Sequence, residues 1–243
     1  MISKQEVKFI NSLKHNKYRL KYDCFIIEGM HIVKEFINSN FIIQSIFSTR
    51  EFTSSYKGDV NLISHKELQR ISSLDNPSSI LAIVKKPKYI FKAKDIAVQN
   101  RIILLDGISD PGNLGSIIRT ADWYGINSVY ISNMSVDVFN PKVIQATMGS
   151  LTRVKIYRVS LEKVLLEVKR QKIPCYAATL SGENLYDLNK PSRCALIFGN
   201  ESHGINPVLL PFLDREIIVP PKHKKIDSLN VAVAFGIILS EFR

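Results

Sequence analysis

The second part of the chain, residues 101–243, alternates short apolar runs with helical patterns, and this alternation restricts the fold more than any other feature. Apolar runs of strand length occupy residues 101–105, 128–131, 154–157, 175–178, 195–198 and 216–219. Apolar residues at helical spacing occupy 114–124, 142–147, 161–171 and 229–242. Because runs that are apolar on both faces are typical of strands buried between two layers of helices, the sequence predicts an α/β domain with a mostly parallel sheet.

Residues 1–84 predict a second, smaller α/β unit. Strand-like runs occupy 24–28, 42–47, 60–63 and 80–84, and a helical pattern occupies 31–37. Ser64 and Glu67 have the spacing of a capping box, which predicts a helix from there to Ile71. The segment 85–94 is rich in lysine and contains a proline, which favours a linker or boundary loop. We therefore expect three parts along the chain: a domain at 1–84, a linker at 85–100 and the larger domain at 101–243.

Positive charge is concentrated in the first part of the chain. The whole chain has 33 Lys and Arg against 22 Asp and Glu, a formal net charge of +11. Residues 1–94 hold 16 basic and 8 acidic side chains, whereas residues 95–243 hold 17 and 14. On charge alone two interpretations stay open: the first part docks a polyanion, or it carries ordinary solvated lysines.

Cysteine content and hydropathy argue against several classes of protein. No pair among the three cysteines has CxxC spacing, which argues against a structural metal site and a disulfide scaffold, and indicates a reducing cytoplasm. The longest apolar stretch, 231–239, is too short for a bilayer span of about 20 residues. The N-terminal residues lack the apolar region of a signal peptide. We expect a cytoplasmic protein with no membrane segment and no metal.

Candidate site residues follow the predicted strands, where parallel α/β sheets bind their ligands. The segment 106–125 contains Asn113 and Arg119, and it lacks the GxGxxG pattern of dinucleotide-binding folds. The segment 197–205 contains a glycine turn with Glu201, and it lacks the Lys and Ser/Thr of a phosphate-binding loop.

A third segment, 219–230, contains Ser228 and Asn230 directly before an apolar helix. No nucleophile elbow surrounds Ser228, which argues against a hydrolase. Taken one by one, these features also have plain structural explanations: Ser228 is then the N-cap of the last helix, and Arg119 either extends its charged end to solvent or forms an ion pair with Asp122.

Taken together, the three segments resemble a known family. NLGSIIRTADWYGI, FGNESHGI and SLNVAVA occur in this order, with FNPKVIQATMGSL between the first two. They resemble the motifs of the SpoU (TrmH-type) RNA 2′-O-methyltransferase family of the SPOUT class. Residues 5–84 resemble that family's basic, ribosomal-protein-like substrate-binding domain, most closely in KHNKYRLKYDCFIIEGMHIVKE.

The resemblance implies a fold, a cofactor and a reaction. The fold is an α/β parallel sheet whose C-terminal segment forms a deep trefoil knot, preceded by the smaller α/β substrate-binding domain. The cofactor is S-adenosylmethionine, and the enzyme is a homodimer through the C-terminal domain. The reaction is methyl transfer to a ribose 2′-hydroxyl of rRNA. Alternatives are a tRNA substrate and a non-catalytic RNA-binding protein that keeps the fold, while an oxidoreductase is disfavoured by the missing GxGxxG pattern.

The same resemblance implies roles for individual residues. The catalytic set is Arg119, Asn113, Glu201, Ser228 and Asn230. The cofactor-binding set is Thr147, Gly149, Phe198, Gly199, Asn200, Gly204, Ile218, Pro220, Ser228 and Leu229. The RNA-binding set, in the basic run of the first domain, is Lys14, Lys17, Tyr18, Arg19 and Lys21.

Physical chemistry adds two expectations. A guanidinium has a pKa above about 12, so we expect Arg119 to bind phosphate and stabilise alkoxide charge and not to act as the base. The family's third motif has Met and Gly where this chain has Lys222 and Lys224. Because burying an unpaired lysine is costly, we expect both ammonium groups to point outward, toward water or RNA.

Overall fold

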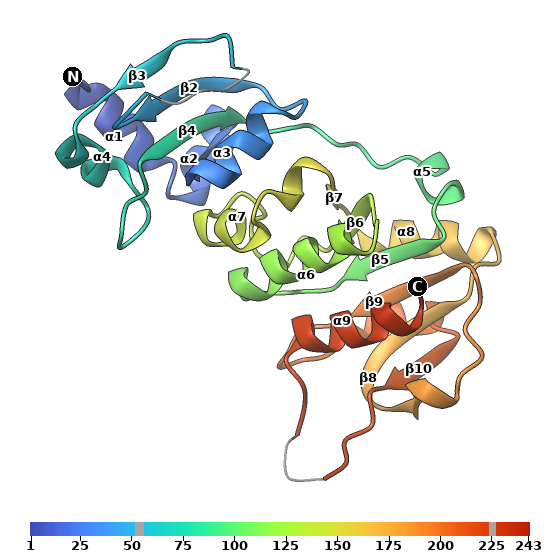
Figure 1. Ribbon diagram of the computed structural model, residues 1–243. Helices are drawn as coiled ribbons and strands as arrows, with labels where there is room; N and C mark the ends of the chain where they lie inside the picture. Colours follow the sequence, from blue (N-terminus) through green and yellow to red (C-terminus); the bar gives the residue numbers. More distant parts are fainter. Residues whose placement is uncertain (52–55, 224–226) are drawn as a thin grey trace. The chain divides into compact units, whose positions relative to one another are not determined.

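The computed structural model describes residues 1–51, 56–223 and 227–243 (Figure 1). Contacts between residues divide it into two compact units. The first unit comprises Met1–Lys88 and Asp137–Thr152, and the second comprises Tyr89–Val136 and Arg153–Arg243.

The first unit is built on a four-stranded sheet in the order β1-β4-β2-β3. β1 and β2 both pair antiparallel with β4, and β3 pairs parallel with β2. The strands are β1 (Cys24–Glu28), β2 (Ile43–Ser48), β3 (Val60–Leu62) and β4 (Ile80–Lys85). The helices are α1 (Lys4–Ser12), α2 (Asn16–Tyr22), α3 (Met30–Ile37), α4 (His65–Ile71), α7 (Pro141–Thr147) and the 3₁₀ turn η1 (Ser150–Thr152).

Alternation along β1 explains how helices cover both faces of this sheet. Side chains of a strand point to opposite faces in turn. Ile26 packs with Ile10 of α1 and Leu68 of α4 in one core cluster. Phe25 faces the other way and meets Phe36 of α3 and Phe139, with ring centroids 5.9 and 4.7 Å away. The segment 137–152 therefore completes the core of the first unit.

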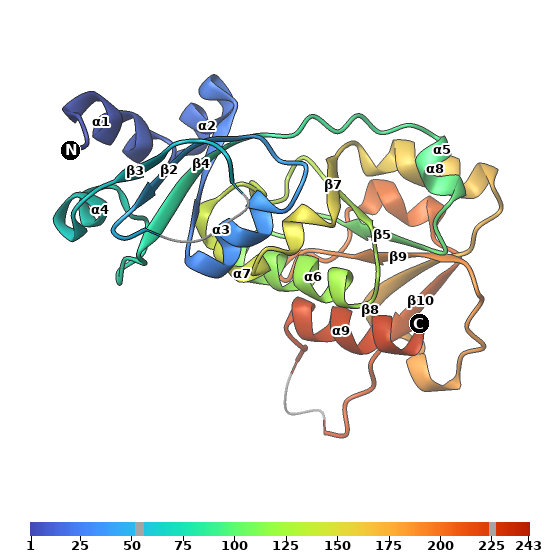
Figure 2. The same cartoon turned by 45° about the horizontal axis from the view of Figure 1, so that its top comes forward.

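The second unit is built on a six-stranded parallel sheet in the order β10-β8-β9-β5-β6-β7. The strands are β5 (Arg101–Leu105), β6 (Ser128–Ile131), β7 (Lys155–Arg158), β8 (Cys175–Asn184), β9 (Cys194–Phe198) and β10 (Arg215–Ile218). The helices are α5 (Lys94–Ala97), α6 (Pro111–Trp123), α8 (Leu161–Arg170), α9 (Val231–Glu241) and the 3₁₀ turns η2 (Leu185–Asp187) and η3 (Pro207–Phe212). Helices α8 and η3 cover one face of this sheet and α6 and α9 the other (Figure 2).

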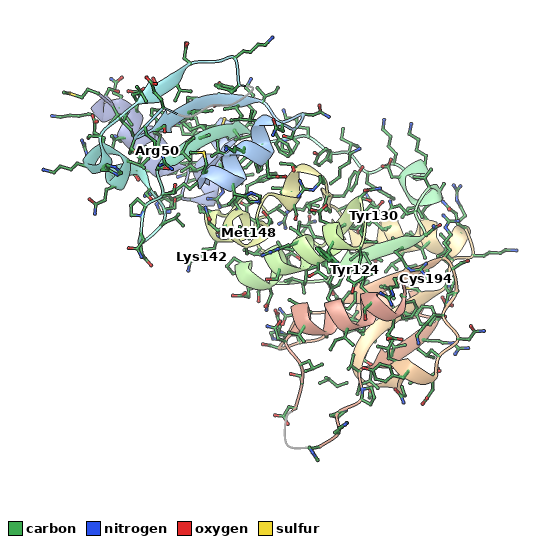
Figure 3. The ribbon with its side chains drawn as sticks, viewed as in Figure 1. Arg50, Tyr124, Tyr130, Lys142, Met148 and Cys194 are labelled. Atoms are coloured by element: carbon green, nitrogen blue, oxygen red, sulfur yellow. The ribbon has the colours of Figure 1, made fainter. Side chains whose placement is uncertain are left out.

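Apolar residues fill the space between the sheet and its helices. Tyr130 on β6 and Cys194 on β9 are both fully buried and are labelled in Figure 3. Burial raises the pKa of the Tyr130 hydroxyl to about 12 and that of the Cys194 thiol to about 11. All three cysteines of the chain are buried free thiols.

Most predicted elements form within one or two residues of their expected bounds, because buried apolar runs leave few alternatives. The basic run at 14–21 is largely helical, as α2, and α5 forms inside the predicted linker. Strand β8 continues to Asn184, six residues beyond its predicted end at 178. The segment 137–152, expected in the larger domain, packs in the first unit.

No helix of the described residues combines the length and the hydropathy that a bilayer span requires. No group of three or more metal-ligating side chains occurs among the same residues.

Candidate cofactor site and RNA-binding helix

Two of the three candidate segments leave the sheet side by side. Strands β5 and β9 pair in register up to Leu105 and Phe198, so the chain leaves both strands at the same edge. The Asp106 amide donates to the Phe198 carbonyl at 2.8 Å, and the Asp106 carboxylate accepts from the Asn206 amide at 2.8 Å. Asp106 is 7% exposed, so a buried side chain joins the loop after β5 to the loop after β9. Sequence reasoning missed this residue, although an acid directly after a strand was the available signal.

The loop after β9 is a tight turn that only glycine permits at its first position. Asn200 and Gly204 exchange two backbone hydrogen bonds of 2.9 Å. A Cβ atom on Gly199 would lie 2.4 Å from the Gly204 carbonyl carbon, and Gly204 itself has a φ of +70°. The Asn200 side chain donates to the Gly107 carbonyl at 2.7 Å and accepts from the Ser202 amide at 2.8 Å. The predicted cofactor ligand Asn200 therefore shapes the loop with its side chain, and the loop presents Glu201 to solvent.

Helix α6 begins with a strong local signal. Asp110 is its N-cap and accepts from the Asn113 amide at 2.7 Å, and Pro111 occupies the first helical position. Proline is favoured there because its missing N–H would have had no partner. This start places Asn113 in the first turn, beside the carboxyl ends of the strands.

Three predicted catalytic residues meet in one hydrogen-bonded chain. Asn113 Nδ2 donates to Glu201 Oε1 at 2.7 Å, and Asn230 Nδ2 donates to Asn113 Oδ1 at 2.8 Å. Asn230 Oδ1 accepts from the amides of Ala232 and Val233, so Asn230 is the N-cap of α9. Because the N-cap oxygen must accept, the direction of every bond in this chain is determined.

Arg119 lies on the solvent side of α6, one position after the buried Ile117 and Ile118. It forms no hydrogen bond or ion pair with any residue that the structure describes. Asp122, the expected ion-pair partner of Arg119, pairs instead with Arg153 at 2.8 Å. The ion-pair explanation of Arg119 is therefore wrong, and its guanidinium is available to a ligand.

The segment before α9 differs from expectation in one respect. Ser228 is exposed and is not the N-cap of the helix, because Asn230 has that place. Leu229 is 47% exposed. Lys222 is exposed, as expected, whereas Lys224 lies outside the described residues.

Other members of the predicted cofactor set lie in different surroundings. Ile218 and Pro220 are half-buried at the end of β10. Phe198 is 1% exposed and its ring packs on Phe235, with centroids 5.0 Å apart, so only its backbone is free to face a ligand.

Thr147 and Gly149 belong to the first unit. Thr147 is fully buried and donates to the Ile144 carbonyl at 2.7 Å. Gly149 has a φ of +93°, and a Cβ atom there would lie 2.7 Å from Glu35 Cγ. The structure therefore gives both residues a packing role within the first unit.

The basic run of the first unit divides into inward and outward charges. Arg19 is 2% exposed and donates to Asp137 at 2.7 Å and to the carbonyls of Leu13 and Lys14 at 2.8 Å. Lys14 donates to the Ser72 carbonyl, and burial lowers the pKa of its ammonium group. The expectation that Arg19 contacts RNA is therefore wrong, because a guanidinium group that is buried and paired inside the protein is not accessible to an RNA phosphate. Lys17 and Lys21 are exposed.

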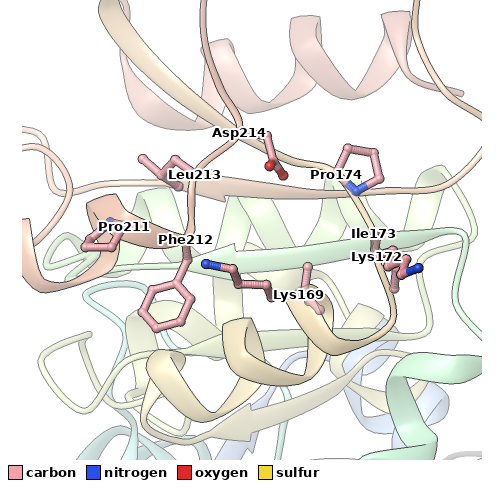
Figure 4. Close-up of a pocket in the computed structure, with 9 residues that line it drawn as sticks. Lys169, Lys172, Ile173, Pro174, Pro211, Phe212, Leu213 and Asp214 are labelled. Atoms are coloured by element: carbon pink, nitrogen blue, oxygen red, sulfur yellow. The ribbon is translucent and has the colours of Figure 1, made fainter.

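A cavity of about 290 Å³ lies elsewhere in the second unit (Figure 4). Its lining includes Lys169, Pro174, Phe212 and Asp214. Pro174 and Asp214 directly precede β8 and β10, so the cavity lies at the amino ends of the strands. The candidate site lies at their carboxyl ends, and the two are separate.

Comparison with known proteins agrees with this architecture. The SpoU rRNA Methylase family matches residues 100–240, and the MRM3-like substrate binding domain matches residues 4–82. The 23S rRNA (guanosine(2553)-2'-O)-methyltransferase RlmP of Bacillus subtilis is 30% identical over 244 residues, which cover 98% of this chain and 96% of RlmP.

Solved structures agree in fold over the full length. A putative RNA methyltransferase of the TrmH family from Porphyromonas gingivalis is 34% identical, with a TM-score of 0.89, covering 100% of this chain and 98% of that chain. An AdoMet-bound rRNA methyltransferase from Sinorhizobium meliloti is 27% identical, with a TM-score of 0.87, covering 100% and 95%. The chain belongs to the SpoU rRNA methylase family. It is an RNA 2′-O-methyltransferase that uses S-adenosylmethionine.

The residues at the strand ends fit that cofactor chemically. S-adenosylmethionine combines a flat adenine ring with a positively charged sulfonium and amino group. The exposed side chain of Leu229 offers apolar surface to a ring, and the exposed carboxylate of Glu201 suits a cationic group. At Gly204, in the same loop, an added Cβ atom would meet nothing within 4 Å, so the backbone there is open to close approach.

Proposed function

We propose that the protein methylates a ribose 2′-hydroxyl of ribosomal RNA at the carboxyl ends of β5, β9 and β10. The observation that carries this proposal is the hydrogen-bonded chain Asn230–Asn113–Glu201, together with the exposed Arg119 on the helix of Asn113, which has no partner among the described residues. The two side-chain hydrogen bonds of this chain join residues of three separate segments. When bound, S-adenosylmethionine supplies an electrophilic methyl group.

In this mechanism each residue has a distinct task. Arg119 grips the phosphate beside the target ribose and stabilises the negative charge that develops on its 2′-oxygen, because a planar guanidinium binds oxyanions with two parallel hydrogen bonds. Asn113 and Asn230 hold Glu201 in place. Ser228 and the backbone of 199–204 and 218–220 line the cofactor. A water molecule or another group takes the proton, since a guanidinium gives up its own proton only above about pH 12.

The proposal extends to domain roles and assembly. Residues 1–84 bind the RNA, and residues 101–243 bind the cofactor in a C-terminal trefoil knot. The enzyme works as a homodimer through this domain. Three buried free thiols and an rRNA substrate suit the reducing cytoplasm.

Incubation with labelled S-adenosylmethionine and separated rRNA and tRNA tests this function. We expect label in rRNA, resistant to alkali at one mapped nucleotide, because a 2′-O-methyl group blocks cleavage of the adjacent phosphodiester. Label confined to tRNA would show that tRNA is the substrate, while the methyl-transfer reaction would stay as proposed. Cofactor binding with no label in either RNA would favour a non-catalytic RNA-binding protein.

A further inference from the structure

Helix α2 carries a row of aromatic rings that the methyl-transfer site does not use. Tyr18 and Tyr22 are one helical turn apart, and their rings stack with centroids 6.2 Å apart and an interplanar angle of 12°. Phe9 of α1 extends the row, because its ring meets Tyr22 edge-on with centroids 5.1 Å apart. Tyr22 is 40% exposed and Tyr18 is half-buried, so part of this aromatic row is accessible to solvent.

Two lysines accompany the rings. The Lys17 ammonium lies 5.9 Å from the centroid of Tyr18, and the Lys21 ammonium lies 5.2 Å from that of Tyr22. Because residues four apart share a helix face, the two lysines and the two tyrosines form adjacent rows on α2. Both lysines are exposed, and neither forms an ion pair within the described part of the chain.

Arg19 anchors this helix through hydrogen bonds on its buried side. Its buried guanidinium joins α2 to the carbonyls of Leu13 and Lys14 and to Asp137. A surface that is ordered before binding loses less conformational entropy when a ligand arrives. The exposed rings are therefore pre-positioned for contact with a flat ligand.

We propose that α2 stacks an unpaired base of the RNA substrate on its tyrosines and binds the flanking phosphates with its lysines. The inference rests on the proposed function, since it takes RNA as the substrate. The lysines select a polyanion, and the rings select a base whose face is free. Bases inside a duplex already stack on one another, so a single-stranded segment fits and a continuous duplex does not. The α2 platform is defined by Phe9, Lys17, Tyr18, Lys21 and Tyr22.

Fluorescence titration of the full-length protein tests the platform. The probes are an oligouridine with one 2-aminopurine and a blunt-ended RNA duplex with the same number of phosphates. We expect Tyr18→Leu combined with Tyr22→Leu to weaken single-strand binding about tenfold and to abolish quenching of 2-aminopurine. Duplex affinity stays within about twofold, because both lysines remain. Tyr18→Phe keeps the aromatic ring, so this variant binds the single strand and quenches 2-aminopurine like the original protein.

Matched variants separate stacking from charge and from damage to the fold. Leu20→Ala alters another exposed apolar side chain of α2, 64% exposed, and leaves both RNAs bound as before. Lys17→Gln with Lys21→Gln weakens both RNAs and lowers the salt dependence of binding. The platform is overturned if a folded Tyr18→Leu variant, checked by its melting curve, binds the single strand like the original protein or loses both RNAs equally.

This test is independent of methyl transfer. If the tyrosines quench 2-aminopurine but no RNA is labelled, the proposed function is wrong and the proposal of the platform stands. A protein that labels RNA equally well with and without the Tyr18 and Tyr22 rings overturns the platform alone.

Discussion

Arg119 differs from Arg158, another arginine of its unit, in what surrounds its guanidinium group. Arg158 donates to the carbonyls of Ser132, Asn133, Ser135 and Val136. Arg119 donates to no group among the described residues and is exposed. A structural arginine fills its hydrogen bonds within the fold, whereas an unfilled one beside a site is ready to bind an oxyanion.

Replacing Arg119 is expected to reduce turnover and to leave the fold intact. Arg119→Ala lowers kcat by about 10²- to 10³-fold, because a contact that strengthens in the transition state is lost. Arg119→Lys fails nearly as badly, since an ammonium group cannot form the planar fork. Calorimetry with S-adenosylmethionine gives an affinity close to that of the original protein. Arg170→Ala, at an exposed arginine of α8, is the matched control, and near-normal kcat in Arg119→Lys would remove Arg119 from the mechanism.

The Asn113 side chain donates one hydrogen bond through Nδ2 and accepts another through Oδ1, so an isosteric substitution can remove one bond and keep the other. Asn113→Asp keeps the oxygen that accepts from Asn230 and replaces the donor to Glu201 with a second oxygen. Two facing carboxylates repel, and we expect kcat to fall about tenfold or more at neutral pH. Near-normal kcat in Asn113→Asp would show that the contact with Glu201 is unimportant.

At the scale of elements, the ion pair between Arg19 and Asp137 joins helix α2 to the segment 137–152. The two residues are 118 positions apart, and Arg19 is almost completely enclosed. A buried charge is tolerable only when it is paired and hydrogen-bonded. This pair therefore orients the helix that carries the platform.

Removing the Arg19 side chain is expected to cost stability because it leaves Asp137 and two carbonyls without their donor. Arg19→Ala lowers the free energy of unfolding by about 3–5 kcal/mol, measured by urea denaturation. Lys17→Ala on the exposed face of the same helix changes it by about 0.5 kcal/mol or less. Equal stabilities of the two variants would contradict the structural role of Arg19.

At the scale of the whole molecule, the two units are not consecutive pieces of chain. The segment 137–152 lies within the sequence of the larger domain but packs in the first unit. Its residues Val143 and Ile144 are 0% and 1% exposed. A simple division of the chain near Lys88 would therefore remove their packing partners.

We expect a fragment that begins at Tyr89 to expose this apolar surface. Each uncovered aliphatic side chain costs about 1.5–3 kcal/mol when it faces water, so the fragment should bind a hydrophobic dye and self-associate. Dye fluorescence and light scattering, with the full-length protein as control, measure the effect. A fragment that keeps the oligomeric state of the full-length protein and binds no dye would show that 137–152 folds against its own domain.

The strands and the family could be predicted from the amino-acid sequence alone. The apolar runs at 101–105 and 195–198 predict strands because no other arrangement buries both of their faces. The capping box at Ser64 and Glu67 predicts the start of α4, because it satisfies backbone amides that a helix end leaves open.

Which of the predicted residues meet depends on contacts between distant parts of the chain. Asn113 meets Glu201 and Asn230 across 88 and 117 residues because the register of β5 and β9 brings their loops to one edge. The basic run at 14–21 looks uniform in sequence, yet Arg19 points inward because Asp137, far along the chain, neutralises it there. Local spacing contains no information about such distant partners, and the burial of a charge depends on them entirely.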